Sequence, residues 1–302
     1  MSTAGVLVGA LLLDAVFGEP RWLWQRLPHP AVLMGKVIGR ADHEFNDGIN
    51  RKAKGMIVVI GLVLAAWVLG AFIGLFGWLP QMLLAAVLLA QRSLVEHVQA
   101  VGDGLRVSLG DGRMMVSRIV SRDTKNMDQS AVARSAIESG AENLSDGVIA
   151  PAFWFLIAGL PGLLIYKIVN TADSMIGYKT ERHKDFGWAA ARLDDVLNWV
   201  PARLTALLIA ATHALMAQWR AIKADAKLHR SPNAGWPESA MARALEVGVA
   251  GPRSYDGVLQ DFPYVNLQGR KELKADDVDA CCRALWLTWA AGLAVVVVLA
   301  IL

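Results

Sequence analysis

Carboxylate, carboxamide and guanidinium side chains are concentrated between residues 117 and 203, on both sides of a strongly apolar segment. On a helix, Glu138 and Glu142 are four residues apart and share one face. Two like charges at this spacing repel each other weakly, and a nearby cation would relieve that repulsion. Ionisable groups are costly to bury beside a membrane segment, so a functional site is the first interpretation of this stretch.

Carboxylates and amides are paired at the same helical spacings beyond the apolar segment. Asn170 and Asp173 are three residues apart, and Asp194 and Asn198 are four residues apart. Magnesium ions prefer such oxygen ligands, keep several waters and bridge to substrate phosphates. We therefore predict a magnesium site whose direct ligands or supporting groups are Glu142, Asp146, Asp173, Asp194 and Asp195.

Each of these groups also has a purely structural explanation. The acidic run from Glu138 to Asp146 could be a solvated helix face, and Asn170 and Asp173 suit helix caps. Arg192 and its acidic neighbours could form an exposed ion pair, which is worth at most ~1 kcal/mol. The joint occurrence of these groups around apolar segments favours a functional site. The sequence has no Walker A loop, zinc-protease motif or nucleophile elbow.

The composition is that of a membrane protein. The chain has 302 residues, of which 55% are hydrophobic, and its mean hydropathy is +0.38. Soluble domains are about 45–50% apolar. Eleven tryptophans fit anchoring at a membrane interface. The net charge of +3 is too small and too dispersed for nucleic-acid binding. The adjacent Cys281 and Cys282 form neither a disulfide framework nor a zinc site.

Apolar segments along the chain predict an all-α, polytopic membrane protein with about four to six membrane segments. Residues 56–79 are uncharged and would reach ~36 Å as a helix, enough to cross a ~30 Å hydrocarbon core. Residues 3–17 predict a shorter membrane helix. Residues 81–90 begin a second crossing that continues as an amphipathic helix. The remaining apolar segments are 148–169, 284–302 and 196–218, the last of which carries Arg203 and His213, which argue against a simple crossing there.

Two topologies stay open at this stage. Residues 148–169 are interrupted by Pro151 and by a Gly-Leu-Pro-Gly sequence, so they either cross once or form a re-entrant hairpin. A single crossing would put residues 170–195 outside the cell, whereas a hairpin would keep them beside the other charged groups. The basic loop at residues 18–55 is cytoplasmic by the positive-inside rule. We favour arrangements with all charged groups on one side.

The chain predicts three parts. Residues 1–218 form a membrane-embedded catalytic domain with helical cytoplasmic loops. Residues 219–283 form a soluble, turn-rich segment, in which Pro237 starts a helix that runs to about Val249. Residues 284–302 form a C-terminal membrane helix.

Several long sequence blocks, in the same order, resemble the adenosylcobinamide-phosphate synthase family (CobD/CbiB). The resemblance covers nearly the whole chain, and two positions depart from the usual pattern, since Glu19 replaces an aspartate and Ser121 replaces a glycine. The blocks are DAVFGEPRWLWQRLPHPAVLMGKVI at 14–38, SRDT at 121–124, AIESGAENLSDGVIAPAFW at 136–154, YKIVNTADSMIGYK at 166–179, AARLDDVLNWVPARL at 190–204 and SPNAGWPESAMARAL at 231–245.

The resemblance implies a multi-pass ligase of the bacterial inner membrane with a cytoplasmic active site. The family joins an aminoalcohol phosphate, such as aminopropanol phosphate, to the carboxylate of adenosylcobyric acid. The product is adenosylcobinamide phosphate, and ATP with Mg²⁺ is consumed. The partners implied are the corrinoid, the aminoalcohol phosphate and membrane lipid. Contact with the enzymes of the later nucleotide-loop steps and homo-oligomer formation stay open, as does the identity of the aminoalcohol.

An ATP-dependent amide ligation needs cations for the phosphates, groups that orient the substrates and a proton acceptor. The catalytic candidates are Arg122, Asp123, Glu138, Arg192 and His29, with His183 as an alternative base. The candidates for binding nucleotide and substrate are Lys125, Asn143, Asn170, Asn198, Arg203, Ser231 and Asn233, with the turn at 231–237 presenting N–H groups to the aminoalcohol phosphate.

Two other classes of protein remain as alternatives. The acidic helices could belong to a magnesium-dependent membrane prenyl- or phospho-transferase, although Asp194-Asp195 followed by Asn198 only approaches the usual spacing of such carboxylates. A transporter with gating ion pairs would also place charges beside membrane segments, but it predicts inverted repeats, which the sequence does not show.

Overall fold

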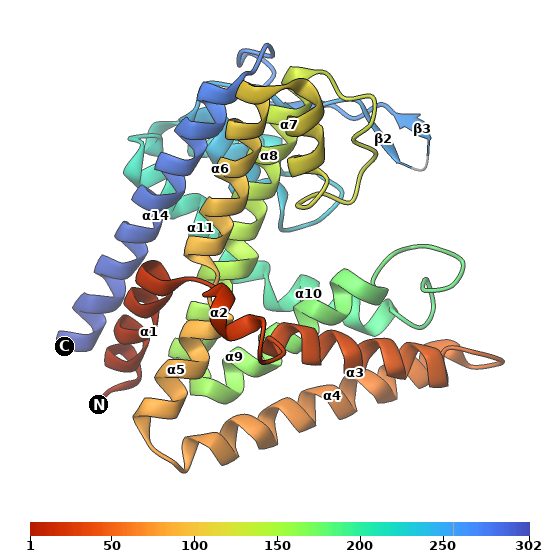
Figure 1. Ribbon diagram of the computed structural model, residues 1–302, viewed down its shortest axis with the longest axis vertical. Coiled ribbons are helices and arrows are strands. Elements are labelled where there is room, and N and C mark those ends of the chain that lie inside the picture. The colour runs from red at the N-terminus through yellow and green to blue at the C-terminus, as the bar shows by residue number, and fades with distance from the viewer. Residues whose placement is uncertain (256) are drawn as a thin grey trace. The chain divides into compact units, whose positions relative to one another are not determined.

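The computed structural model describes residues 1–255 and 257–302 and is mainly α-helical (Figure 1). Among the described residues, four helical segments are long and apolar enough to cross a membrane. The predicted all-α, polytopic membrane fold is therefore confirmed. The four candidate spans are Arg51–Gly74, Trp78–Val107, Gln129–Ile176 and Ala275–Ile301, the second and third being runs of consecutive helices.

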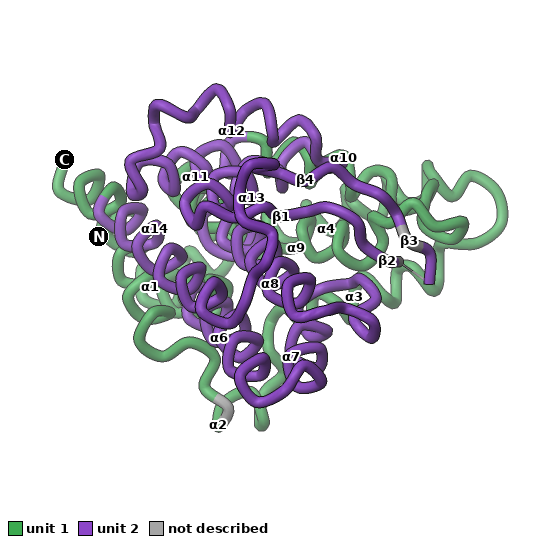
Figure 2. Tube along the Cα trace, turned by 90° about the horizontal axis from the view of Figure 1, so that it is seen from above, with its two compact units in different colours: residues 1–90, 150–199, 295–302 green, residues 91–149, 200–294 purple. Residues whose placement is uncertain are grey.

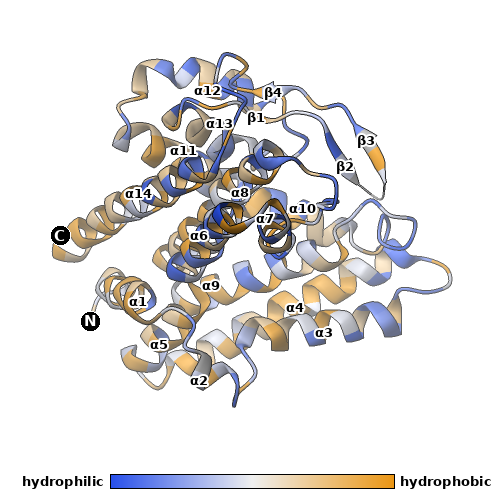
Figure 3. Cartoon of the chain, turned by 45° about the horizontal axis from the view of Figure 1, so that its top comes forward, coloured by the Kyte–Doolittle hydropathy of each residue, from blue (hydrophilic) through white to orange (hydrophobic). Residues whose placement is uncertain are grey.

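Hydrophobic side chains point outward from these spans. In the helix Arg51–Gly74, only 11% of the most apolar 18-residue window is buried, and the helix is hydrophobic along most of its length (Figure 3). Such an exposed hydrophobic surface is unfavourable in water and favourable in lipid.

The chain divides into two compact units, each assembled from separate segments (Figure 2). Unit 1 consists of residues 1–90, 150–199 and 295–302, and unit 2 of residues 91–149 and 200–294. Segments of the two units alternate along the chain, whereas the parts predicted from the sequence follow one another. The predicted functional division at residues 218 and 283 stays a prediction.

Unit 1 is a group of helices in which α9 packs against α4, α3, α10, α1 and α5. Gly70 of α4 lies so close to Pro161 of α9 that a side chain would not fit between them. The helices of unit 1 are α1 (Thr3–Phe17), α2 (Arg21–Trp24), α3 (Pro30–Phe45), α4 (Arg51–Gly74), α5 (Trp78–Leu88), α9 (Ala150–Ile176) and α10 (Trp188–Leu197).

The helix α9 bends sharply near its middle. Ala158 and Gly159 leave helical geometry, and Gly159 has a φ of 61°, in the region that favours glycine. A Cβ atom at Gly162 would overlap the carbonyl group of Trp154, so the chain folds tightly at this bend. The break expected between residues 159 and 162 therefore lies at 158–159. Pro151 does not bend α9; it follows a π-helical turn, a widening that can accommodate a proline within a helix.

Unit 2 is built around α8, which is buried on almost every side from Val132 to Leu144. It packs against α6, α7, α13 and β1, and small residues such as Ala136 and Gly140 allow the close approach. The helices of unit 2 are α6 (Gln91–Val107), α7 (Leu109–Val116), α8 (Gln129–Leu144), the π-turn η1 (Ser145–Ile149), α11 (Trp199–Thr212, from its second residue), the 3₁₀ turn η2 (Met216–Gln218), α12 (Trp219–Ala226), α13 (Gly235–Ala244) and most of α14 (Ala275–Ile301).

Two pairs of short antiparallel strands complete unit 2. Strand β1 (Val249–Ala250) pairs with β4 (Tyr264–Val265), and β2 (Arg253–Tyr255) pairs with β3 (Val258–Gln260). The β1–β4 pair lies on α8 and α13, and it carries the backbone toward the polar centre of the unit.

Two expected helix boundaries are wrong, for local reasons. The helix expected to reach Val249 ends at Ala244, because Glu246 is left-handed (φ 55°) and the N–H of Val247 closes the helix end on the carbonyl of Ala242. The last helix begins at Ala275 instead of residue 284, because Asp277 in its first turn accepts the N–H of Lys274.

A glycine pair in α4 tests the packing of unit 1. A Cβ atom at Gly55 would overlap the carbonyl oxygen of Phe186, whereas Gly61 has no atom within 4 Å of that position. We expect Gly55→Ala to lower the free energy of unfolding by about 2 kcal/mol or more. Gly61→Ala should leave it unchanged or raise it slightly, because alanine favours the helix. Thermal unfolding in detergent measures both, and equal melting temperatures would contradict the packing described here.

Candidate active site

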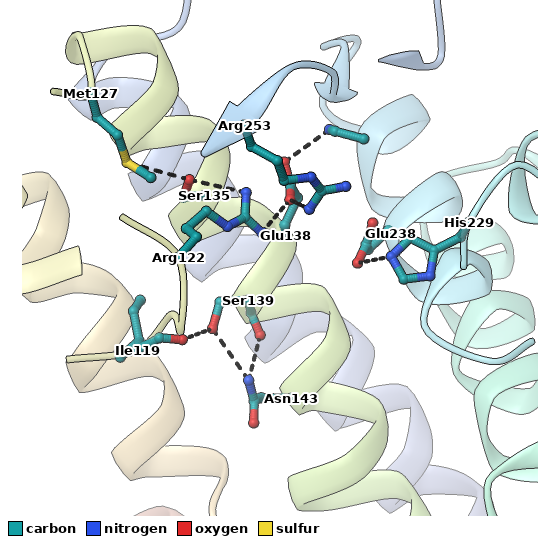
Figure 4. A network of polar contacts seen from close by, with 11 residues as sticks. Ile119, Arg122, Met127, Ser135, Glu138, Ser139, Asn143, His229, Glu238 and Arg253 are labelled. Carbon is teal, nitrogen blue, oxygen red and sulfur yellow. Dashed lines mark hydrogen bonds and ion pairs between the residues drawn. The ribbon is translucent and has the colours of Figure 1, made fainter. Parts of the chain in front are cut away.

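A buried carboxylate, Glu138, lies at the polar centre of unit 2 (Figure 4). Its Oε2 atom accepts hydrogen bonds from Arg122 (2.7 Å) and Arg253 (3.0 Å), and its Oε1 atom accepts one from the N–H of Ala250 (2.8 Å). The side chain of Glu138 is only 1% exposed. A charge at such depth is tolerated only where partners compensate the lost hydration, and Glu138 has three.

The sequence motif Ser121–Thr124 is hydrogen-bonded to the β2–β3 hairpin. The carboxylate of Asp123 accepts hydrogen bonds from the hydroxyl of Ser254 (2.9 Å) and the N–H of Gly257 (2.7 Å). The N–H of Asp123 in turn donates to the carbonyl of Ser254 (3.1 Å). The hydrogen bond from Gly257, followed by that from Ser254, lowers the pKa of Asp123. Asp123 therefore orients the loop that carries Arg122.

A cleft of about 730 Å³ opens beside this ion-pair cluster. Among the described residues, four cationic side chains and two acidic ones line it. The excess of donors and positive charge makes the cleft suitable for a polyanion such as a nucleotide. The cations are Arg122, Lys125, Arg134 and Arg253, and the acids are Asp123 and Asp128.

A second buried carboxyl group, Glu238, pairs with His229 (Figure 4). The Nε2 atom of His229 lies 3.6 Å from Oε1 of Glu238. Among the residues described, Oε2 of Glu238 has no hydrogen-bond partner. Burial, together with the negative charges of Glu138 and Glu142, raises the pKa of Glu238 well above its ordinary value. Two neighbouring carboxyl groups are thus held in different environments, a pattern typical of acid–base sites.

The ring of His229 is fixed in one tautomer. Its Nδ1 atom accepts the N–H of Ser231 (3.0 Å), so Nε2 carries the hydrogen when the ring is neutral. Burial and the charge of Arg253 lower the pKa of His229. A neutral imidazole therefore faces the carboxyl group of Glu238.

The turn at 231–237 has N–H groups that are already hydrogen-bonded. The hydroxyl of Ser231 accepts the N–H groups of Asn233 and Ala234, each at 3.2 Å. Arg203 donates to the side chain of Asn233 (3.2 Å) and lies over the ring of Trp236. The structure thus brings Arg203, Ser231 and Asn233 together. Four of the N–H groups expected to meet a phosphate are already in use, because Ser231 donates to His229 and Trp236 donates to the carbonyl of Asn233.

Unit 1 holds a separate hydrogen-bonded network. Asp194 accepts hydrogen bonds from the amides of Asn170 (3.2 Å) and Asn198 (3.0 Å), and Asn198 accepts one from the hydroxyl of Tyr166 (2.9 Å). Burial raises the pKa of Asp194, although both amide bonds act in the opposite direction, and the charge of Asp195 raises it further. The pairing of Asp194 with Asn198 expected from their spacing is therefore confirmed, whereas Asn170, which was expected beside Asp173, donates to Asp194.

The five predicted magnesium ligands are divided between the units. Glu142 and Asp146 belong to unit 2, and Asp173, Asp194 and Asp195 belong to unit 1. In the part of the chain that the structure describes, no three acidic, histidine or cysteine side chains converge as a metal cage.

The other predicted site residues have local partners. Asn143 donates to the carbonyl of Ser139 (2.9 Å) one turn earlier in α8. Arg192 lies 3.6 Å from Asp195 and is largely exposed. Both ring nitrogens of His29 are in use, because Nδ1 accepts the N–H of Ala31 and Nε2 contacts the carbonyl of Val87. The alternative base His183 approaches Asp42 at 3.5 Å.

The chain matches known proteins over most of its length. A family model described as CobD/Cbib protein matches residues 7–285. The chain belongs to the CobD/Cbib family. It is 47% identical to the cobalamin biosynthesis protein CobD of Brucella anthropi, over 94% of this chain and 92% of that protein.

Other relatives in the family carry the same name. The cobalamin biosynthesis protein CobD of Sinorhizobium fredii is 49% identical, over 91% of this chain and 90% of its own. That of Rhodobacter capsulatus is 43% identical, over 88% of each chain. No solved structure matches the chain.

Three residues of this candidate site were not singled out from the sequence: Arg253, His229 and Glu238. Their only sequence signal is proximity to the block at 231–245, since Glu238 lies within that block and His229 lies two residues before it. Arg253 reaches Glu138 across 115 residues of chain, a separation that no local pattern reveals.

The buried carboxyl of Glu238 should make the stability of the protein depend on pH. Below the ordinary value of 4.5, this carboxyl is protonated in both the folded and unfolded states, and its contribution to stability is fully present. As pH rises above this value, the contribution decreases by about 1.4 kcal/mol per pH unit until the pH reaches the raised pKa of the folded state. Glu238→Gln cannot titrate.

Melting temperatures of the wild type and Glu238→Gln across pH test this linkage. We expect the variant to gain stability relative to the wild type as pH rises, with the exposed Glu246→Gln as the matched control. A pH-independent difference between the wild type and Glu238→Gln would show that Glu238 ionises normally.

Proposed function

We propose that the protein acts in cobalamin biosynthesis as a membrane ligase that forms adenosylcobinamide phosphate. It would join the free carboxylate of adenosylcobyric acid to the amine of an aminoalcohol phosphate, with consumption of ATP. Membership of the CobD/Cbib family and the names of its relatives support the pathway. The basic loop at residues 18–55 supports a cytoplasmic site at the bacterial inner membrane.

The observation that carries the proposal is the basic cleft built around the buried Glu138. Amide formation from a carboxylate and an amine is unfavourable in water, so the acid must first be activated. In the proposed reaction, a carboxylate oxygen of the corrinoid attacks the γ-phosphorus of ATP and ADP leaves, which gives an acyl phosphate. The amine nitrogen then attacks the acyl carbon, inorganic phosphate leaves, and a proton is lost from nitrogen.

The arginines of the cleft would stabilise the charge on the transferred phosphoryl group. Arg122 and Arg253 each use one donor on Glu138, which fixes both guanidinium groups before any ligand arrives. Donors that are already in position need no reorganisation during the reaction, and removing one typically slows an enzyme by about 10²–10³-fold. Lys125 and Arg134 add positive charge to the same cleft.

Magnesium would arrive with the nucleotide. Mg²⁺ usually takes one or two protein carboxylates and completes its coordination with water and substrate phosphates. The absence of a three-ligand cage among the described residues is compatible with that mode. Glu142 and Asp146 in unit 2, and Asp173, Asp194 and Asp195 in unit 1, stay the proposed ligands or supports. A bound ion would neutralise phosphate charge.

The remaining polar residues are proposed to position the substrates. Corrinoids carry several amide groups, which the amides of Asn143, Asn170 and Asn198 could bind. Arg203 lies over the ring of Trp236 and donates to Asn233, so the pair offers a guanidinium and an amide beside an aromatic surface in unit 2.

The ligase activity can be measured on the full chain purified in detergent. The assay contains adenosylcobyric acid, aminopropanol phosphate and ATP–Mg²⁺, and mass spectrometry identifies the corrinoid product. We expect a corrinoid that is heavier by the amidated aminopropanol phosphate. Arg122→Gln should slow its formation on the order of 10²-fold or more, while the exposed Arg118→Gln should not.

Parallel assays of Asp173→Asn and Asp194→Asn would assign the metal ligands. Loss of product in either variant, with partial recovery at high Mg²⁺, would place the ion in unit 1. A wild-type protein that forms no amide with any aminoalcohol phosphate, and leaves ATP intact, would overturn the proposed function.

A further inference from the structure

A second, smaller cavity shares two residues with the large cleft. It has a volume of about 110 Å³ and is lined by Ala250 and Arg253, which also line the cleft, and by His229, Arg230 and Phe262. A cavity needs only about 10–15 Å³ to admit one water. The small cavity therefore holds several waters or one compact polar group, whereas the cleft is as large as a typical small-molecule site.

Two guanidinium groups converge on one aromatic ring in this cavity. The central carbon of the Arg230 guanidinium lies 4.1 Å from the centre of the Phe262 ring, and that of Arg253 lies 4.8 Å from it. The two positive charges are therefore within about 9 Å of each other and repel, and an anion bound near both would offset that repulsion. The Nε atom of Arg253 is buried and, within the described residues, has no hydrogen-bond partner.

A third donor comes from His229. Because its Nδ1 atom is occupied by the N–H of Ser231, its Nε2–H is the group left for a ligand. The 3.6 Å separation between Nε2 and the carboxyl of Glu238 is too long for a good hydrogen bond. Burial raises the pKa of Glu238, which favours the neutral form of this neighbour, and a neutral carboxyl group does not repel an anion.

We propose that this cavity binds the phosphate group of the amine substrate, while the large cleft binds the nucleotide. The inference rests on the proposed ligase function, which requires two different phosphorylated molecules at one site. Arg253 lines both cavities, so its guanidinium would lie between the two phosphate-bearing substrates. The amine would then be delivered next to the acyl group that the nucleotide activates.

The assignment explains why a ligase would select a phosphorylated amine. A phosphate seated on Arg230, Arg253 and His229 gains charge-assisted hydrogen bonds that a free aminoalcohol cannot make. A site that is built to hold such a group leaves its own buried donors unpaired when the group is missing. Phosphorylation therefore acts as the recognition handle, and the amine at the other end reacts.

Arg230→Gln tests the assignment, because Arg230 lines the small cavity and not the cleft. Amide formation is measured at saturating ATP with aminopropanol phosphate and, separately, with hydroxylamine, which has no phosphate and traps the activated carboxylate. We expect the KM for aminopropanol phosphate to rise on the order of tenfold or more, while the rate of trapping by hydroxylamine stays at the wild-type value. The exposed Arg220→Gln is the matched control.

Two results would overturn the proposal. One is an unchanged KM for aminopropanol phosphate in Arg230→Gln. The other is an equal loss of hydroxylamine trapping, which would place Arg230 in activation or in folding. Phe262→Leu provides a second variant that retains both charges and removes the aromatic surface, and it should raise the same KM in the same direction.

A binding experiment separates failure of this proposal from failure of the proposed function. Calorimetric titration of the wild type and Arg230→Gln with O-phosphoethanolamine, and with ethanolamine, needs no catalysis. Binding of the phosphorylated amine that Arg230→Gln weakens would support the cavity even if the wild type forms no amide. Equal binding of both amines, or no binding of either, would remove the phosphate subsite even if the ligase is active.

Discussion

The burial of one carboxylate, Glu138, determines how the candidate site is built. A charged group at 1% exposure would destabilise the fold if it were unpaired, and breaking such a buried pair typically costs about 3–5 kcal/mol. Arg122 arrives from the loop after α7, Arg253 from β2 and the N–H of Ala250 from β1. The need to compensate one charge therefore holds three segments of unit 2 around α8, and it fixes two guanidinium groups at the edge of the cleft.

The same centre gives its two buried glutamates opposite surroundings. Glu138 has two cations and a backbone donor, whereas Glu238 has a neutral imidazole at 3.6 Å and an unpartnered oxygen among the described residues. Glu138 organises positive charge for anionic substrates, whereas burial and the charge of Glu138 raise the pKa of Glu238 and so favour its neutral form. Arg253 connects both parts, since it pairs with Glu138 and lines the small cavity as well as the cleft.

The sequence predicts the class of fold well, because long apolar segments such as 56–79 have few alternatives to a membrane helix. It also predicts local pairs, such as Asp194 with Asn198, because helical spacing determines them. It does not predict the partners of Glu138, since Arg122 and Arg253 are 16 and 115 residues away and only tertiary packing brings them together. Likewise, no local sequence pattern distinguishes Glu238 from an exposed glutamate. The left-handed residue that ends α13 is Glu246, so the glycine that usually marks such a helix end is absent from this position.

The affinity of Glu138→Gln for ATP–Mg²⁺ tests the central claim most directly. Removing a negative charge beside four cations should strengthen the binding of a polyanion if charge alone matters. If Glu138 instead holds Arg122 and Arg253 in position, the variant should bind ATP–Mg²⁺ on the order of tenfold more weakly, while the exposed Glu246→Gln binds as the wild type does. The affinities for ATP–Mg²⁺ are compared on samples of each variant that are monodisperse and unfold cooperatively. Tighter binding of ATP–Mg²⁺ by such a Glu138→Gln sample would contradict the organising role of Glu138.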